Sequence, residues 1–220
     1  MAENSFKNVF TQPKAFFLLP VKTLFLLGGV FSAFFILIAG LVFFDYTNSM
    51  DNAIFSLMRS NSSNSILDQT LQRIVFLGSS QFVLPLSLLM GVFLSLYRRN
   101  LALGVWFVLS VVIFEALLES LKHLFLHSVQ WLSRSANFPS AIALSLTLFY
   151  GLLVLLIPHL IAHQTLKKVL FYSLLGLIFL IGLALIVLGV SFSSVLGGFC
   201  LGALGACFSI GIYLSVFQKI

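Results

Sequence analysis

Six long apolar runs constrain the fold of this 220-residue chain more than any other feature of its sequence. A helix that crosses a membrane needs about 20 mainly apolar residues, and the runs are close to that length. They cover residues 24–44, 82–97, 101–120, 139–160, 169–190 and 195–217. Each run is continuously apolar and lacks the alternating pattern of a membrane β-barrel strand. We therefore expect an all-α, polytopic membrane protein built as a bundle of six membrane-spanning helices.

Composition supports the same class of protein. Hydrophobic residues make up 60% of the chain and charged residues only 8%, a balance that no soluble domain of this size can bury in one core. No long polar linker divides the sequence, so residues 1–220 are expected to form a single membrane domain. Residues 1–22 precede the first run as a cytoplasmic N-terminal segment. That run is longer than the apolar part of a secretory signal peptide, which indicates a retained anchor.

The positive charges divide unevenly between the two sides that six spans would create. With a cytoplasmic N-terminus, eight of the twelve Lys and Arg residues lie on the cytoplasmic side. These eight are Lys7, Lys14, Lys22, Arg98, Arg99, Lys167, Lys168 and Lys219, and the other four are Arg59, Arg73, Lys122 and Arg134. Because short loops rich in Lys and Arg stay in the cytoplasm, we expect both termini on that side.

The formal net charge of +6 is therefore concentrated on the cytoplasmic side. Its natural partners are the anionic headgroups of membrane lipids, and nucleic acid is not implied. One longer polar stretch, residues 45–81, lies between the first two runs on the outer side. Its apolar residues recur at helical spacing in two short segments, which predicts two amphipathic helices in this loop.

The last run carries small residues at four-residue spacing, namely Gly198, Gly202 and Ala206. Small side chains let a second membrane helix approach closely. We expect that second helix to belong to the same chain.

Several segments resemble, in order and spacing, those of the type 2 phosphatidic acid phosphatase family. They include LLESLKHLF, NFPSAIALSLTLFY and VLGGFCLGAL. The resemblance implies a six-helix membrane enzyme that removes phosphate from lipid phosphates or pyrophosphates. Together with the compact size and short loops, it implies a bacterial inner membrane protein. It also implies that three catalytic motifs meet on the outer side, after the third span, at the start of the fourth and between the last two.

Most of the residues that the family uses for chemistry are replaced in this chain. Lys122 matches the lysine of the first motif, and Pro139 and Ser140 match the start of the second. The replaced positions are Val129 and Leu185 for two arginines, Ile142 and Ser191 for two histidines, and Ser194, or a deletion, for the aspartate. Phosphate-ester hydrolysis by this route needs a nucleophilic imidazole, a proton donor and cationic groups. The sequence therefore favours a non-catalytic pseudoenzyme, with no catalytic residue, metal or cofactor.

Such a protein would bind a lipid phosphate or a membrane protein partner through the inherited outer cavity. Lys122, Arg134 and Ser140 are the candidate phosphate-binding residues, with Ser140 near a helix N-terminus, where backbone amides favour anions. Glu115 and Glu119 form a candidate polar cluster with Lys122, because spacings of four and three place them on one helix face.

Two alternatives remain open. The first is a divergent lipid phosphate or pyrophosphate phosphatase, in which His123 or His127 is recruited together with Glu119. The second is a small transporter or membrane assembly subunit that uses Glu115, because ionisable groups at membrane depth usually have a function.

Overall fold

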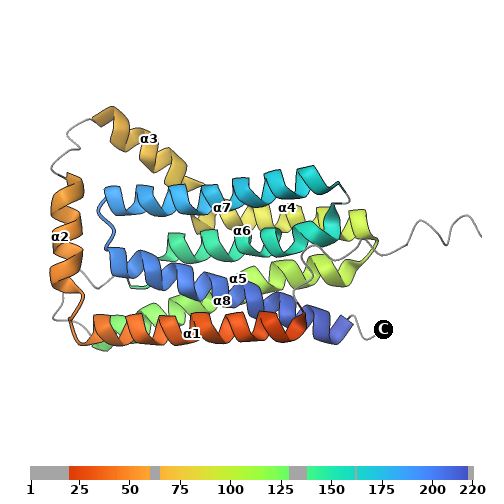
Figure 1. Cartoon of the computed structure of the whole chain (residues 1–220), viewed down its shortest axis with the longest axis horizontal. Helices are drawn as coiled ribbons and strands as arrows, with labels where there is room; N and C mark the ends of the chain where they lie inside the picture. Colours follow the sequence, from red (N-terminus) through yellow and green to blue (C-terminus); the bar gives the residue numbers. More distant parts are fainter. Residues whose placement is uncertain (1–19, 60–64, 129–137, 162, 218–220) are drawn as a thin grey trace, which may run out of the picture.

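The computed structural model describes residues 20–59, 65–128, 138–161 and 163–217. Within these ranges the chain is helical and contains no strand (Figure 1). The helices are α1 (Val21–Phe43), α2 (Asn48–Arg59), α3 (Ser65–Phe76), α4 (Ser80–Arg98), α5 (Leu101–Ser128), α6 (Ala141–Leu160), α7 (Gln164–Val187) and α8 (Phe192–Phe217). The expected all-α fold is confirmed.

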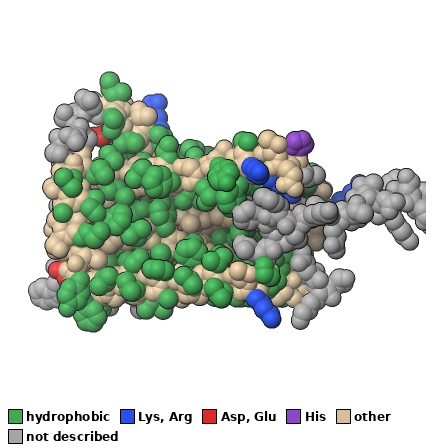
Figure 2. All heavy atoms as spheres, in the orientation of Figure 1, with side chains coloured by type: hydrophobic (Ala, Val, Ile, Leu, Met, Phe, Trp, Pro, Cys, Tyr) green, Lys and Arg blue, Asp and Glu red, His purple; other side chains and the backbone are tan. Residues whose placement is uncertain are grey.

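Six helical segments among the described residues are long and apolar enough to cross a membrane. Five of them are α1, α5, α6, α7 and α8, and in the sixth α3 and α4 follow one another from Ile66 to Arg98. On the face shown in Figure 2, apolar side chains cover the length of the bundle, and the visible charged side chains lie near its two ends. The protein is therefore an integral membrane protein, as the six apolar runs predicted.

The centre of the bundle is formed by α6 and α8. In the most apolar 18-residue stretch of each helix, 67% of α6 and 61% of α8 are buried inside the bundle, compared with 11% of α1. A Cβ atom on Gly198 would lie 2.6 Å from the carbonyl oxygen of Ser140, and one on Gly202 would lie 2.7 Å from that of Leu144. The small residues thus let α8 contact α6 within the same chain, as expected.

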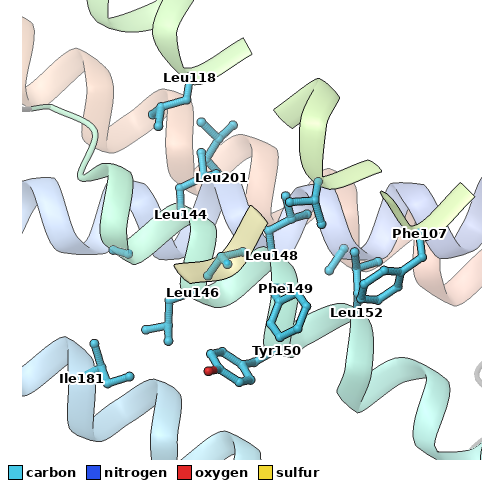
Figure 3. Close-up of a cluster of buried hydrophobic side chains, with 14 of the residues drawn as sticks. Phe107, Leu118, Leu144, Leu146, Leu148, Phe149, Tyr150, Leu152, Ile181 and Leu201 are labelled. Atoms are coloured by element: carbon cyan, nitrogen blue, oxygen red, sulfur yellow. The ribbon is translucent and has the colours of Figure 1, made fainter. Parts of the chain in front are cut away.

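Large apolar side chains fill the space around α6 (Figure 3). Leu144, Leu148 and Phe149 are at most 1% exposed. The ring of Phe149 packs edge-on against Phe107 of α5, with 5.7 Å between ring centroids. Ile181 of α7 is fully buried on another side of the same cluster. This packing connects α5, α6 and α7 into one unit.

The two short helices α2 and α3 lie together near one end of the bundle, which we call the α2 end. α2 crosses this end almost at right angles to the long helices, and α3 slopes from it towards the start of α4 (Figure 1). α2 contacts α7 and α8, and α3 contacts α7. The two amphipathic helices predicted for residues 45–81 are therefore present.

One boundary differs from the expectation. The sequence places the end of the third span at residue 120, but α5 continues to Ser128. Lys122 and His123 therefore lie on a helix and not in a loop. The apolar residues of LKHLFLHS recur at helical spacing, which lets the helix extend past its charged residues.

Candidate functional site

The α2 end brings together the first turns of α6 and α8. The backbone amide of Ser140 donates a hydrogen bond to the carbonyl oxygen of Ser194, at 3.0 Å. The Ser140 hydroxyl oxygen accepts a hydrogen bond from the amide of Ala143, at 3.4 Å, and so caps α6. Two of the segments that carry the family resemblance are therefore adjacent in space.

Ile142, where the resemblance places a histidine, lies in the first turn of α6 and is partly buried. It faces the junction between α3 and α4, where a Cβ atom on Gly78 would lie 3.0 Å from the Ile142 Cγ2 atom. Its side chain packs against the apolar core. A hydrocarbon side chain in this place can neither donate nor accept a proton.

Leu185, where the resemblance places an arginine, lies near the end of α7 and is only 1% exposed. Its neighbour Ala184 is 2% exposed, and both belong to the apolar core. The position therefore contributes packing and presents no charge to the α2 end.

The first turn of α8 carries hydroxyl groups that are already paired. Ser191, where the resemblance places the second histidine, donates a hydrogen bond from its hydroxyl to that of Ser194, at 2.7 Å. Ser194 is 1% exposed. Ser193 donates both its backbone amide and its hydroxyl to the carboxylate of Asp51, at 3.0 Å and 2.6 Å.

Asp51 of α2 therefore acts as the acidic cap of α8. A carboxylate is favourable at a helix N-terminus, where amide groups lack partners within the helix. α2 makes a second contact nearby, because a Cβ atom on Gly189 would lie 3.1 Å from the Phe55 ring. Gly189 has a φ of +94°, a conformation that favours glycine. Asp51 and Phe55 together hold α2 against the turn between α7 and α8.

Sequence reasoning does not identify this role of Asp51, because 142 residues separate it from Ser193. The only available signal is an acidic residue in an amphipathic segment of the loop, which does not specify a partner.

Of the three candidate phosphate-binding residues, the structure describes two. Lys122 forms an ion pair with Glu119 at 3.7 Å, and the two side chains are 25% and 66% exposed. Ser140 is 6% exposed and is occupied by its capping bond. Arg134 and the replaced position Val129 lie outside the described residues. Lys122 is thus a partly exposed cation in the C-terminal part of α5.

Glu115 does not join the ion pair of Glu119 and Lys122. Its two carboxyl oxygens instead pair with the hydroxyl groups of Ser80 in α4 and Ser145 in α6. Sequence reasoning singled out Glu115 but neither serine, because an isolated serine in an apolar run is a weak signal.

The histidines of the rewired-site alternative are only partly described. The side chain of His123 is exposed on α5, and the side chain of His127 lies outside the described set. In the parts of the chain that the structure describes, no three His, Cys, Asp or Glu side chains are grouped as a metal site would require. Glu119 pairs with Lys122, so its carboxylate is directed to a cation.

Comparisons with known proteins show a similarity in structure. No family model matches the sequence, and no curated protein matches it. A crystal structure of a transmembrane PAP2-type phosphatidylglycerolphosphate phosphatase from Bacillus subtilis superposes with a TM-score of 0.76 and 23% identity. The match covers 88% of this chain and 98% of that one. The chain is thus an integral membrane protein with the fold of a transmembrane PAP2-type phosphatase.

Proposed function

We propose that this protein is a non-catalytic, phosphatase-like membrane protein that binds a lipid phosphate at the α2 end of the bundle. The observation that carries the proposal is that Leu185 is 1% exposed within the apolar core. In the related fold this position is expected to hold a cation for the phosphate group. A buried leucine provides no charge to stabilise a transferring phosphoryl group.

The remaining motif positions support the loss of chemistry. Ile142 offers no proton, and Ser191 donates its hydroxyl to Ser194. Among the described residues, no carboxylate or imidazole is hydrogen-bonded to Ser191 to act as a general base. A serine hydroxyl is a weak nucleophile unless an adjacent base activates it. Asp51 is the nearest described carboxylate to this turn, and it accepts two hydrogen bonds from Ser193.

Binding, unlike hydrolysis, needs only a cation and hydrogen-bond donors at the level of the lipid headgroups. Lys122 supplies a partly exposed cation, and Arg134 is a second candidate in the segment that follows α5. The ion pair with Glu119 is near the surface and is worth at most about 1 kcal/mol, so a phosphate dianion competes for Lys122.

The orientation that follows places the α2 end outside a bacterial inner membrane, with both termini in the cytoplasm. Support comes from the distribution of cations among the described residues. Lys22, Arg98, Arg99, Lys167 and Lys168 lie at the opposite end, and Arg59, Arg73 and Lys122 lie at the α2 end.

The test is a turnover and binding assay on the purified protein in lipid vesicles. Phosphatidylglycerolphosphate serves as the probe, because the structurally similar Bacillus subtilis protein is described as its phosphatase. We expect no phosphate release above empty vesicles, while the Bacillus subtilis enzyme in matched vesicles releases phosphate. Native mass spectrometry should show retention of phosphatidylglycerolphosphate in preference to phosphatidylglycerol, with retention reduced by Lys122→Ala and increased by Glu119→Gln.

Two results would contradict the proposal. Phosphate release that Lys122→Ala or His123→Ala abolishes would show a functioning, rewired enzyme. Equal retention of the two lipids in all three proteins would show that the headgroup phosphate is not recognised.

A further inference from the structure

Three side chains from three different helices form a polar cluster below the α2 end. The Ser80 hydroxyl of α4 lies 3.0 Å from the Oε2 atom of Glu115 in α5. The Ser145 hydroxyl of α6 lies within hydrogen-bond distance of the Oε1 atom of Glu115. The two hydroxyl oxygens are 3.3 Å apart, and that of Ser145 also lies 2.9 Å from the carbonyl oxygen of Ala141. We call Ser80, Glu115 and Ser145 the carboxyl–hydroxyl cluster.

The number of protons in this cluster depends on the state of Glu115. Each serine has a single hydroxyl proton, so an ionised Glu115 leaves two protons for four oxygen–oxygen contacts. A protonated carboxyl supplies a third. Glu115 then donates to Ser145, Ser145 donates to the carbonyl oxygen of Ala141, and Ser80 donates to Glu115. The neutral acid satisfies three of the four contacts, and only the longest one, between the two serines, is left without its own proton.

The charges around the cluster favour the same state. On the helices packed against α5, the sequence has one charged residue in α4, Arg98, and one histidine in α6, His159, and neither kind of residue occurs in α8. Both residues lie near the helix ends that are opposite the α2 end. On α5 itself, Lys122 lies about 10 Å further along the helix axis and is paired with Glu119. Tyr150 of α6 directs its hydroxyl to the carbonyl oxygen of Leu77. Within the described residues Glu115 forms no ion pair, so an ionised Glu115 would be a charge in an apolar bundle without a paired cation, which is costly.

We propose that Glu115 is an intramembrane proton-binding site whose carboxyl group holds one exchangeable proton. With that proton bound, the hydrogen bonds of the carboxyl–hydroxyl cluster connect α4, α5 and α6. Release transfers the proton to water and leaves a carboxylate, and the Ser145 hydroxyl then turns from the carbonyl oxygen of Ala141 to Glu115. Further along α5, the side chains of Glu119 and Lys122 are 66% and 25% exposed, so we expect the proton to leave towards this end of the helix. This site is independent of the proposed lipid-phosphate function.

Infrared spectroscopy of the protein reconstituted in vesicles at neutral pH tests the proposal. The chain contains only six Asp and Glu residues, so the carbonyl stretch of a protonated carboxyl can be assigned by substitution. We expect one such band, which shifts on exchange into heavy water. Glu115→Gln should remove it, and Glu119→Gln, the matched control one helical turn away, should keep it. Ser145→Ala should move the band to higher frequency, because the carboxyl loses its hydrogen-bond partner.

Absence of a protonated carboxyl band in the wild-type protein would overturn the proposal, as would a band that persists in a folded Glu115→Gln variant. If Glu115→Gln fails to fold, the spectrum of Ser145→Ala tests the assignment instead. A carboxyl band that does not shift in Ser145→Ala would belong to a residue other than Glu115 and would overturn the proposal. A failed lipid-binding assay would leave these spectra unchanged, so the two proposals can fail separately.

Discussion

At the scale of single residues, the α2 end is organised by side chains whose partners lie far away in the sequence. Asp51 is the clearest case, because its carboxylate accepts both the amide and the hydroxyl of Ser193. An acidic or amide cap is normally supplied by the residue that immediately precedes the helix. Here a separate helix supplies it, so that one interaction both caps α8 and fixes α2.

Asp51→Ala should therefore destabilise the protein by about 1 kcal/mol, the usual cost of removing a cap. Asp51→Asn should cost less, because an amide oxygen still accepts from the Ser193 amide. Unfolding of the purified protein by sodium dodecyl sulfate in mixed micelles measures both values. An equal loss of stability in the two variants would show that the charge of Asp51 matters and the capping geometry does not. Unchanged stability of Asp51→Ala would show that the cap does not stabilise the protein.

At the scale of helices, the backbone contact between α6 and α8 determines the centre of the bundle. In a bilayer, close packing replaces much of the hydrophobic driving force that holds soluble helices together. Gly202 allows that packing, since a Cβ atom there would lie 2.7 Å from the Leu144 carbonyl oxygen and 2.8 Å from the Thr147 Cβ atom.

Gly202→Ala should separate α6 from α8 and cost about 1–3 kcal/mol, the usual penalty for overpacking. Gly176→Ala is the matched control, because it lies inside α7 and a Cβ atom there meets nothing within 4 Å. The control should be neutral or slightly stabilising, since alanine favours a helix more than glycine does. The same detergent titration compares the two variants. A Gly202→Ala protein as stable as Gly176→Ala would show that α8 can move away from α6 without loss.

At the scale of the whole molecule, the sequence predicted the six spans because membrane thickness leaves few alternatives to apolar helices of fixed length. It did not predict the end of α5, where charged residues near 120 resemble a loop although the helical spacing continues to Ser128. The sequence also did not predict which polar side chains meet between helices. Ser80 and Ser145 meet Glu115 from sequence separations of 35 and 30 residues, and neither serine stands out in its own segment.

The orientation of the whole bundle remains a prediction, and the positions of the cations make it testable. Two exposed glutamines mark its two ends, Gln69 on α3 near the α2 end and Gln164 at the start of α7 at the opposite end. In a background without Cys200 and Cys207, a membrane-impermeant maleimide should label Gln69→Cys in intact bacterial cells. It should label Gln164→Cys only after permeabilisation, because the Lys- and Arg-rich end stays in the cytoplasm. The reverse pattern would place the α2 end inside, so that Lys122 would face cytoplasmic phosphates and the proposed lipid ligand would have to come from the inner leaflet.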